Sequence, residues 1–318
     1  MKALVLGGGS IKGCFQAGAI SELLMAGFKP SKIYGVSVGS LNGAFLTDQA
    51  AKLKNKDNKP DWPAIGEALK NLWLTRIDSF DKIGKTRGGP AILWDSIFSE
   101  FNGLIDTENL QQLIGSIISE DNLRNSPVEF FAGCVNLSNG QFLMADPSYP
   151  DIMKYIIAST AIPVMMPISY INGSPLVDGG LRNVTPLKYA ANDTAVNAIV
   201  SVACQAEQVP PVNLNYENLL SYAERLMDII VNGIVTNDLE WAEYINDYCP
   251  KDGTIVKVGP FQGYRYIPIG VIRPAQEPDI DIQNFNQDQI KNLLEIGQYT
   301  ARQQLKTGKF KEILSQPD

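Results

Sequence analysis

Histidine is missing from this sequence of 318 residues. Its absence excludes a Ser-His-Asp triad and any metal site that relies on imidazole ligands. A serine nucleophile in this chain would therefore need Asp, Glu or Lys as its base. Cysteine is scarce, and the cysteines that occur are widely scattered without a Cys-x-x-Cys pair: Cys14, Cys134, Cys204 and Cys249. We expect reduced, mostly buried thiols in a cytoplasmic protein, with neither a bound metal nor a cofactor.

Positive charge and long apolar runs are also in short supply. Lys and Arg together number 27 against 34 Asp and Glu, which gives a net charge of -7, and no basic block stands out. We therefore expect no nucleic-acid binding, and the net charge would not attract the protein to an anionic membrane. The apolar run at residues 3–6 breaks at once into glycines, so we expect no signal peptide. No stretch reaches the length of a membrane span.

What the chain does contain is the hydrophobic patterning of an α/β protein. Hydrophobic residues make up 45% of the sequence, enough for a sizeable core. Near the N-terminus, short apolar runs alternate with segments of helical periodicity: strands at 3–6 and 32–36, and helices at 14–26 and 38–51. This alternation predicts a three-layer α/β/α fold with a mostly parallel central sheet.

The remaining elements are expected along the rest of the chain. We predict an inserted region at about 52–124, which contains a helix at 62–74, an irregular stretch with a short helix at 75–106 and a helix at 107–119. A hairpin at 128–145, a short helix at 151–159, a strand ending at Val177 and a buried strand at 196–203 would complete a first unit over residues 1–203. In the second region, 204–318, we expect two helices separated near Gly233, strands at 254–258 and 266–272, and an amphipathic helix at 287–305, packed on the same globule.

A serine motif follows the second predicted strand. The run is Gly35-Val36-Ser37-Val38-Gly39, and a helix is expected directly after it. In a strand–turn–helix setting, Gly-x-Ser-x-Gly forms a nucleophile elbow, in which small residues on both sides allow a tight turn. Ser37 is therefore a candidate nucleophile for acyl transfer. The structural alternative is a Gly/Ser-rich turn that merely caps the helix.

A glycine-rich loop, Gly7-Gly8-Gly9-Ser10-Ile11-Lys12-Gly13, follows the first strand. It lacks the third glycine of a dinucleotide fingerprint and the Lys-Ser/Thr pair of a P-loop. A third interpretation is an oxyanion hole, whose backbone N–H groups would face a tetrahedral intermediate. Ser37 on the neighbouring strand favours this third interpretation, because acyl transfer needs both parts.

Asp178 is the candidate base. It ends the apolar strand before Gly179-Gly180, which leave room for another side chain to approach. An ordinary Asp-Gly turn would have the same sequence. In a chain without histidine, however, the serine requires a carboxylate or lysine partner, and partial burial would raise the pKa of this aspartate towards a useful value.

Three ordered motifs resemble those of the patatin-like phospholipase family. They are Gly8-Gly9-Ser10-Ile11-Lys12-Gly13, Gly35-Val36-Ser37-Val38-Gly39 and Asp178-Gly179, and the segment Ala158-Ser159-Thr160-Ala161-Ile162-Pro163 is similar to the one that precedes the catalytic Asp of that family. The resemblance covers about residues 3–203. It implies an α/β/α fold and a Ser37–Asp178 dyad acting on acyl esters, usually of lipids, with the oxyanion held by Gly8, Gly9 and Ser10. Lys12, Gly13, Gly35, Gly39 and Gly179 would support the site.

The sequence therefore favours a serine hydrolase that releases fatty acid from phospholipid or related esters. Two alternatives stay open: a dinucleotide-binding oxidoreductase, and a lipid-binding scaffold without turnover. Several apolar residues are candidates for an acyl-chain wall or an interfacial surface, or for ordinary core: Trp94, Phe98, Phe101, Met165 and Met166. A lipid or acyl-ester substrate and peripheral membrane contact are the expected partners, and the sequence gives no indication of the oligomeric state.

Overall fold

The computed structural model describes residues 1–88, 103–208, 211, 219–278, 280 and 284–317. Within them, the core is an eight-stranded sheet with the order β10-β9-β1-β2-β5-β8-β7, in which β6 pairs separately with β5. The strands are β1 (Lys2–Leu6), β2 (Lys32–Val36), β5 (Glu129–Asn136), β6 (Gln141–Ala145), β7 (Ser169–Ile171), β8 (Ser174–Asp178), β9 (Ala198–Val202) and β10 (Ile269–Ile272). The neighbours from β10 to β5 pair in parallel, and the others are antiparallel. The predicted α/β fold with a mostly parallel sheet is confirmed.

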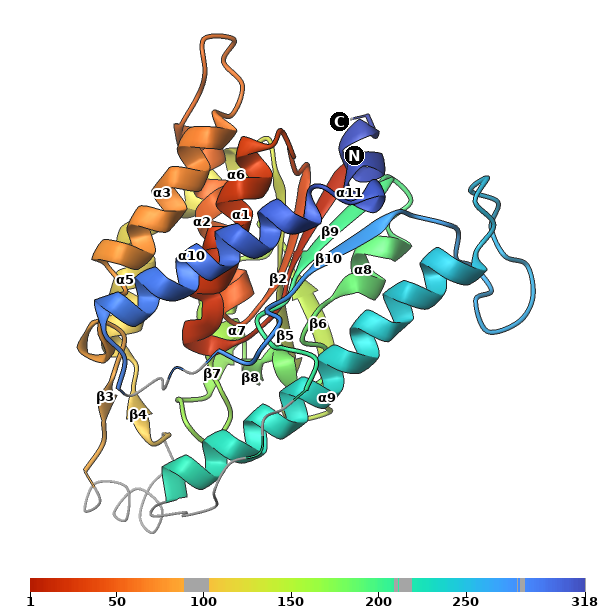
Figure 1. Cartoon of the computed structure of the whole chain (residues 1–318). Helices are drawn as coiled ribbons and strands as arrows, with labels where there is room; N and C mark the ends of the chain where they lie inside the picture. Colours follow the sequence, from red (N-terminus) through yellow and green to blue (C-terminus); the bar gives the residue numbers. More distant parts are fainter. Residues whose placement is uncertain (89–102, 209–210, 212–218, 279, 281–283, 318) are drawn as a thin grey trace.

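Helices lie on both faces of this sheet (Figure 1). On one face are α1 (Gly13–Met25), α2 (Val38–Lys52), α3 (Trp62–Thr75) and α10 (Gln287–Gln304), and on the other are α8 (Leu187–Asn192) and α9 (Leu219–Tyr248). Strand β1 shows why both faces are covered. Leu4 and Leu6 belong to the core under the first layer, whereas Ala3 and Val5 belong to the core under the second. Since alternate residues of a strand point to opposite faces, a strand buried on both sides is apolar throughout.

The C-terminal helix α10 packs directly on α1. A Cβ atom on Gly18 would lie 2.0 Å from the Leu294 carbonyl oxygen, and one on Gly297 would lie 2.0 Å from the Phe15 carbonyl oxygen. Glycine on each helix therefore permits a backbone approach that no other residue would allow. Strand β10 extends the sheet beyond β9, so the region after residue 203 contributes to the same sheet and to its helical layer.

Helix α9 corrects the prediction of two helices separated near Gly233. It is one continuous helix, with Val235, Leu239, Ala242 and Ile245 buried at helical spacing. A glycine in a helix costs about 1 kcal/mol relative to alanine, which is too little to break a helix that buries a long apolar face. The predicted strand at 254–258 is also wrong. Val256 instead exchanges backbone hydrogen bonds with Gly263 and Tyr264 in a loop outside the sheet.

The remaining elements are distributed along the chain. These are the helices α5 (Glu108–Ile117), α6 (Glu120–Asn125), α7 (Ile152–Thr160) and α11 (Gly308–Ser315), the 3-10 turns η1 (Ser10–Lys12), η2 (Phe80–Lys82) and η3 (Gly179–Leu181), and a small antiparallel pair, β3 (Lys85–Thr86) with β4 (Ile105–Asp106). Among the described residues, no helix combines the length and apolar character needed to cross a membrane.

Candidate active site

Ser37 occupies a sharp turn between β2 and α2. Its backbone lies at φ 57° and ψ −127°, a conformation that is uncommon for a residue other than glycine. A Cβ atom on Gly35 would lie 2.4 Å from the Gly39 carbonyl oxygen, and one on Gly39 would lie 2.2 Å from the Leu6 carbonyl oxygen. The two glycines are thus required by the close approach of the backbone on either side of the serine, as expected for an elbow.

The elbow is supported by a side chain from α7. The Ser37 amide donates a hydrogen bond to the Ser159 hydroxyl at 3.0 Å, and that hydroxyl donates to the Gly133 carbonyl at 2.7 Å. Ser159 is completely buried. Just beyond it, the Ala161 carbonyl accepts a hydrogen bond from the Asp178 amide at 3.0 Å. The C-terminal end of α7 and the residue that follows it therefore contact the backbone of both candidate catalytic residues.

Asp178 lies at the end of β8, where it pairs with Cys134 on β5. Its exposed fraction is 5%, and that of Ser37 is 6%. Burial raises the pKa of Asp178 to about 6, although the Ser37 hydroxyl and the Gly180 amide lower it. The Gly180 amide donates to Oδ1 of Asp178 at 2.7 Å. Burial is the only effect that raises this pKa, and it outweighs the two hydrogen bonds. Asp178 is therefore a weaker acid than an exposed aspartate, and it lies next to the Ser37 hydroxyl in surroundings with little water.

The glycine loop borders the serine from the neighbouring strand. A Cβ atom on Gly8 would lie 3.1 Å from the Ser37 Cβ, so the loop backbone passes close to the elbow. The Gly8 amide, however, donates to the Val184 carbonyl at 3.1 Å. In the described part of the chain, the amides of Gly9 and Ser10 have no hydrogen-bond partner. Of the three residues predicted to hold the oxyanion, Gly9 and Ser10 therefore have amides open to a ligand, whereas the Gly8 amide is already bonded.

A buried polar network holds this loop from behind. The Gln16 side-chain amide donates to the carbonyls of Gly7 (3.2 Å) and Val202 (2.9 Å). Asn42 donates to the Gly13 carbonyl at 3.1 Å and to the Gln16 side-chain oxygen at 3.0 Å, and it accepts a bond from the Trp73 indole at 2.9 Å. Such a satisfied network rigidifies the backbone it contacts. No local sequence motif indicates these residues.

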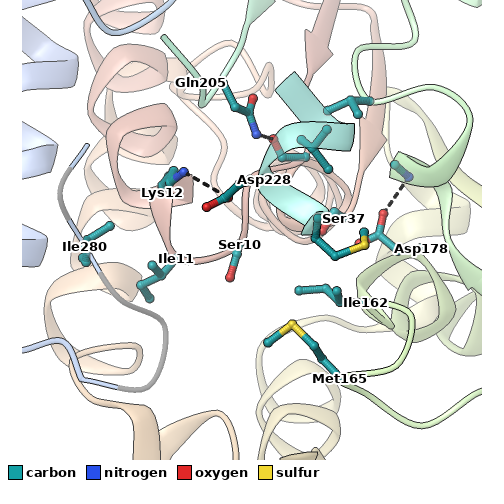
Figure 2. A pocket seen from close by; sticks show the side chains of 16 residues that line it. Ser10, Ile11, Lys12, Ser37, Ile162, Met165, Asp178, Gln205, Asp228 and Ile280 are labelled. Atoms are coloured by element: carbon teal, nitrogen blue, oxygen red, sulfur yellow. Dashed lines mark hydrogen bonds and ion pairs between the residues drawn. The ribbon is translucent and has the colours of Figure 1, made fainter. Parts of the chain in front are cut away.

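Ser37 and Asp178 line one cavity of about 200 Å³, shown in Figure 2. Gly8, Gly9, Ser10 and Lys12 of the loop line it too. Its apolar wall comes from several elements: Ile11, Ile162, Met165, Val184, Met227, Val231 and Ile280. Met165 therefore lines the cavity, and it also belongs with Met166, Leu104 and Ile105 to a small buried cluster. Trp94, Phe98 and Phe101 lie outside the described residues.

Lys12 is held by carboxylates from the C-terminal region. Its ammonium group hydrogen-bonds Glu277 and lies 3.7 Å from Oδ1 of Asp228 on α9. Burial acts to lower the pKa of Lys12, but Asp228 and Glu277 outweigh it, and the pKa is raised. Gln205, from the loop after β9, donates to the Gly8 carbonyl at 3.0 Å. These contributions from residues beyond 203 were not predicted, because they carry no recognisable motif.

A family model described as "Patatin-like phospholipase" matches residues 4–191 of the chain. The match spans more than half of the sequence and includes the glycine loop, the serine elbow and Asp178. The chain therefore belongs to the patatin-like phospholipase family.

Curated relatives match this chain at low identity. "Lysophospholipase nte1" of Aspergillus terreus is 27% identical over 191 residues, which is 57% of this chain and 10% of the relative. The "Uncharacterized protein YjjU" of Escherichia coli is 25% identical over 203 residues, covering 62% of this chain and 50% of the relative. "Patatin-like phospholipase domain-containing protein 7" of mouse is 25% identical over 223 residues, covering 69% and 14%. The chain thus spans half or less of the length of these relatives.

Among solved structures, VipD from Legionella pneumophila aligns with 96% of this chain and 66% of its own, at a TM-score of 0.45 and 14% sequence identity.

Proposed function

We propose that the protein hydrolyses acyl esters of lipids through a covalent acyl-enzyme on Ser37. One observation carries the proposal. The serine of a strained elbow and a buried carboxyl with a pKa of about 6 line the same cavity, although they come from different strands. A carboxyl with that pKa is ionised at neutral pH yet basic enough to accept a proton. Family membership and the name of the Aspergillus relative support a lipid ester as substrate.

In the proposed first half-reaction, the Ser37 Oγ attacks the ester carbonyl carbon while Asp178 takes the hydroxyl proton. The carbonyl oxygen gains negative charge and accepts hydrogen bonds from the open amides of Gly9 and Ser10. When the tetrahedral intermediate collapses, the C–O bond to the alcohol breaks, and Asp178 returns the proton to the leaving alcohol. In the second half-reaction a water molecule replaces the alcohol, and the same steps release the fatty acid and restore Ser37.

The apolar wall supports the choice of a fatty acyl group. Ile162 and Met165 lie on one side of the serine (Figure 2). Met227 and Val231, both on α9, also line the cavity. We also propose peripheral contact with a lipid aggregate. Next to the wall-lining Met227 and Val231, α9 exposes Leu226, Ile229 and Ile230. A lipid substrate would reach the cavity past this apolar surface. The cytoplasmic location stays a prediction.

The dinucleotide-binding alternative receives less support. A pyrophosphate could use the open amides of Gly9 and Ser10, but it would also be favoured by a nearby cation that is not already paired. The cation of this loop, Lys12, is already bonded to Glu277 and close to Asp228. Together with the family match, this pairing favours the hydrolase.

Hydrolysis of a short-chain p-nitrophenyl ester tests the proposal. Ser37→Ala and Asp178→Asn should each reduce kcat by about a thousandfold or more, because each removes a group required in every turnover. Ser40→Ala, on the same helix as the elbow, is the matched control. Its buried hydroxyl has no partner in the described structure, so activity should stay within about twofold. Near-normal activity of Ser37→Ala would refute the proposal. A wild-type protein that binds lipid vesicles but hydrolyses no ester would instead be a lipid-binding scaffold.

A further inference from the structure

The cavity carries an excess of negative charge. Of the described residues that line it, the charged ones are Lys12, Asp178 and Asp228. Asp178 belongs to the proposed dyad and is ionised above its pKa of about 6. The nearby Arg273 does not line the cavity. Its Nε atom donates a hydrogen bond to the Gln205 carbonyl at 3.3 Å. The positive charge of Arg273 interacts with three carboxylates, those of Glu207, Glu277 and Glu243. Lys12 is therefore the cation that a bound substrate would meet.

That cation is already neutralised within the protein. One oxygen of Glu277 accepts a hydrogen bond from Lys12, and the other accepts one from the Ala206 amide at 2.8 Å. The side chains of Lys12 and Glu277 are only 12% and 14% exposed. Because both oxygens of Glu277 are bonded, the pair is fixed and partly dry, and Lys12 offers little net charge to a phosphate or carboxylate.

Asp228 also lines the cavity, and among the described residues it has no such hydrogen-bonded partner. Its side chain is 56% exposed, and its distance to the Lys12 ammonium, 3.7 Å, is longer than a hydrogen bond. Figure 2 shows its carboxylate between Lys12 and Ser10, to the left of Ser37, whereas Ile162 and Met165 lie below Ser37. An ester whose acyl chain lies against Ile162 and Met165 leaves the part of the cavity lined by Lys12 and Asp228 for its alcohol portion.

We propose that Asp228 determines specificity for the charge of the alcohol portion of the ester, favouring an alcohol that bears an ammonium group and excluding one that is anionic. This inference rests on the proposed hydrolase function. The ammonium would lie against the carboxylate that Lys12 leaves uncompensated. An anionic alcohol would instead face Asp228 and Asp178, and the one cation among the described lining residues, Lys12, is already bonded to Glu277. A single charge at about 4–6 Å in a half-exposed site changes the binding of an ion by about tenfold.

The test compares three esters with the same short acyl chain, so that all remain monomeric: hexanoylcholine, 1-hexanoylglycerol and 1-hexanoylglycerol 3-phosphate. For each enzyme, kcat/KM of the two charged esters is divided by that of the neutral one, which removes differences in the folded fraction. The wild type should prefer the choline ester to the phosphate by about tenfold or more. In Asp228→Asn this preference should fall by about tenfold or more, and Asp228→Lys should reverse it.

Glu240→Gln provides the matched control, because it removes an exposed carboxylate from the same helix outside the cavity lining. It should leave both ratios within about twofold. The preference should also weaken as salt is added, since the interaction is between charges near solvent. Ratios that do not change in Asp228→Asn, or a wild type that prefers the phosphate ester, would overturn the assignment of Asp228 while leaving the hydrolase intact. Failure of the wild type to hydrolyse any of the three esters would overturn the proposed function itself.

Discussion

The Ser37 amide and the Ser159 hydroxyl form a buried hydrogen bond of 3.0 Å. The Ser159 hydroxyl in turn donates a hydrogen bond to the Gly133 carbonyl of β5. A side chain from α7 therefore connects the elbow after β2 to the neighbouring strand. The backbone of Ser37 has a positive φ, a conformation that persists only when its surroundings stabilise it. We infer that Ser159 is a positioning residue for the elbow.

Substituting Ser159 with alanine leaves a buried backbone N–H without a partner. We expect a loss of stability of ~1–3 kcal/mol. Because the serine oxygen would be less well placed, kcat should fall by about tenfold while KM changes less than about twofold. Ser40→Ala should leave both the free energy of unfolding and kcat nearly unchanged, since the Ser40 hydroxyl is buried without a partner in the described structure. Equal behaviour of the two variants would show that Ser159 does not position the elbow.

The pH dependence of hydrolysis should report on Asp178. Its carboxyl must be ionised to accept the proton of Ser37, and burial raises its pKa to about 6. We therefore expect kcat/KM to increase about tenfold per pH unit below pH 6 and to level off above about pH 7. A pH profile of the p-nitrophenyl ester reaction, with tryptophan fluorescence as a check on folding, measures this. An activity that begins to rise only above about pH 8 would indicate a base other than Asp178.

Asp178 should also cost the protein stability at neutral pH. Its folded pKa of about 6 lies above the unfolded value of about 3.9. Below about pH 4 both states are protonated and the aspartate carries no penalty. As the pH rises towards 6, only the unfolded state loses its proton, so stability falls, by at most ~3 kcal/mol above pH 6. Asp178→Asn keeps an acceptor for the Gly180 amide and removes this penalty. Its free energy of unfolding should exceed that of the wild type at pH 8 but not at pH 4, and an equal difference at both pH values would contradict this account.

Two helical glycines should respond to alanine in opposite ways. At Gly18 the new Cβ would lie 2.0 Å from the Leu294 carbonyl oxygen, so the contact between α1 and α10 must separate. We expect a destabilisation of more than ~2 kcal/mol. At Gly233, within α9, a Cβ would meet no atom within 4 Å. There alanine should stabilise by ~0.5–1 kcal/mol through its helix propensity. Urea denaturation compares the two, and a loss of stability in Gly233→Ala would show that the helix needs flexibility at that point.

Local patterns predicted most of the fold well. The strands and helices around the glycine loop and the elbow follow directly from apolar periodicity and from glycine placement, and their bounds agree with β1, α1, β2 and α2 within a residue or two. Gly233 led to the wrong prediction because a local helix breaker was weighed without the apolar contacts that α9 makes with the sheet. The small strand β7 and the short helices α6, α8 and α11 are too short for periodicity to identify.

The candidate site was predictable only in part, for a related reason. Motifs indicated Ser37, Asp178 and the glycine loop, since each is marked by neighbouring glycines. The motifs did not indicate that the Gly8 amide donates a hydrogen bond to the Val184 carbonyl, because Val184 lies far from the glycine loop in the sequence. Asp228 and Glu277 likewise reach the cavity through tertiary packing alone. Nothing in their immediate sequence distinguishes them from carboxylates on the surface.

Covalent labelling tests the central claim most directly. A fluorophosphonate loses fluoride to an activated serine and leaves a stable phosphonyl group on its oxygen, which mass spectrometry of the digested protein can locate. We predict that the native protein is labelled at Ser37 and at no other serine, that Ser37→Ala is not labelled, and that Asp178→Asn reacts at least about a hundredfold more slowly. Labelling that bypasses Ser37, or that proceeds as fast in Asp178→Asn as in the wild type, would contradict the Ser37–Asp178 dyad.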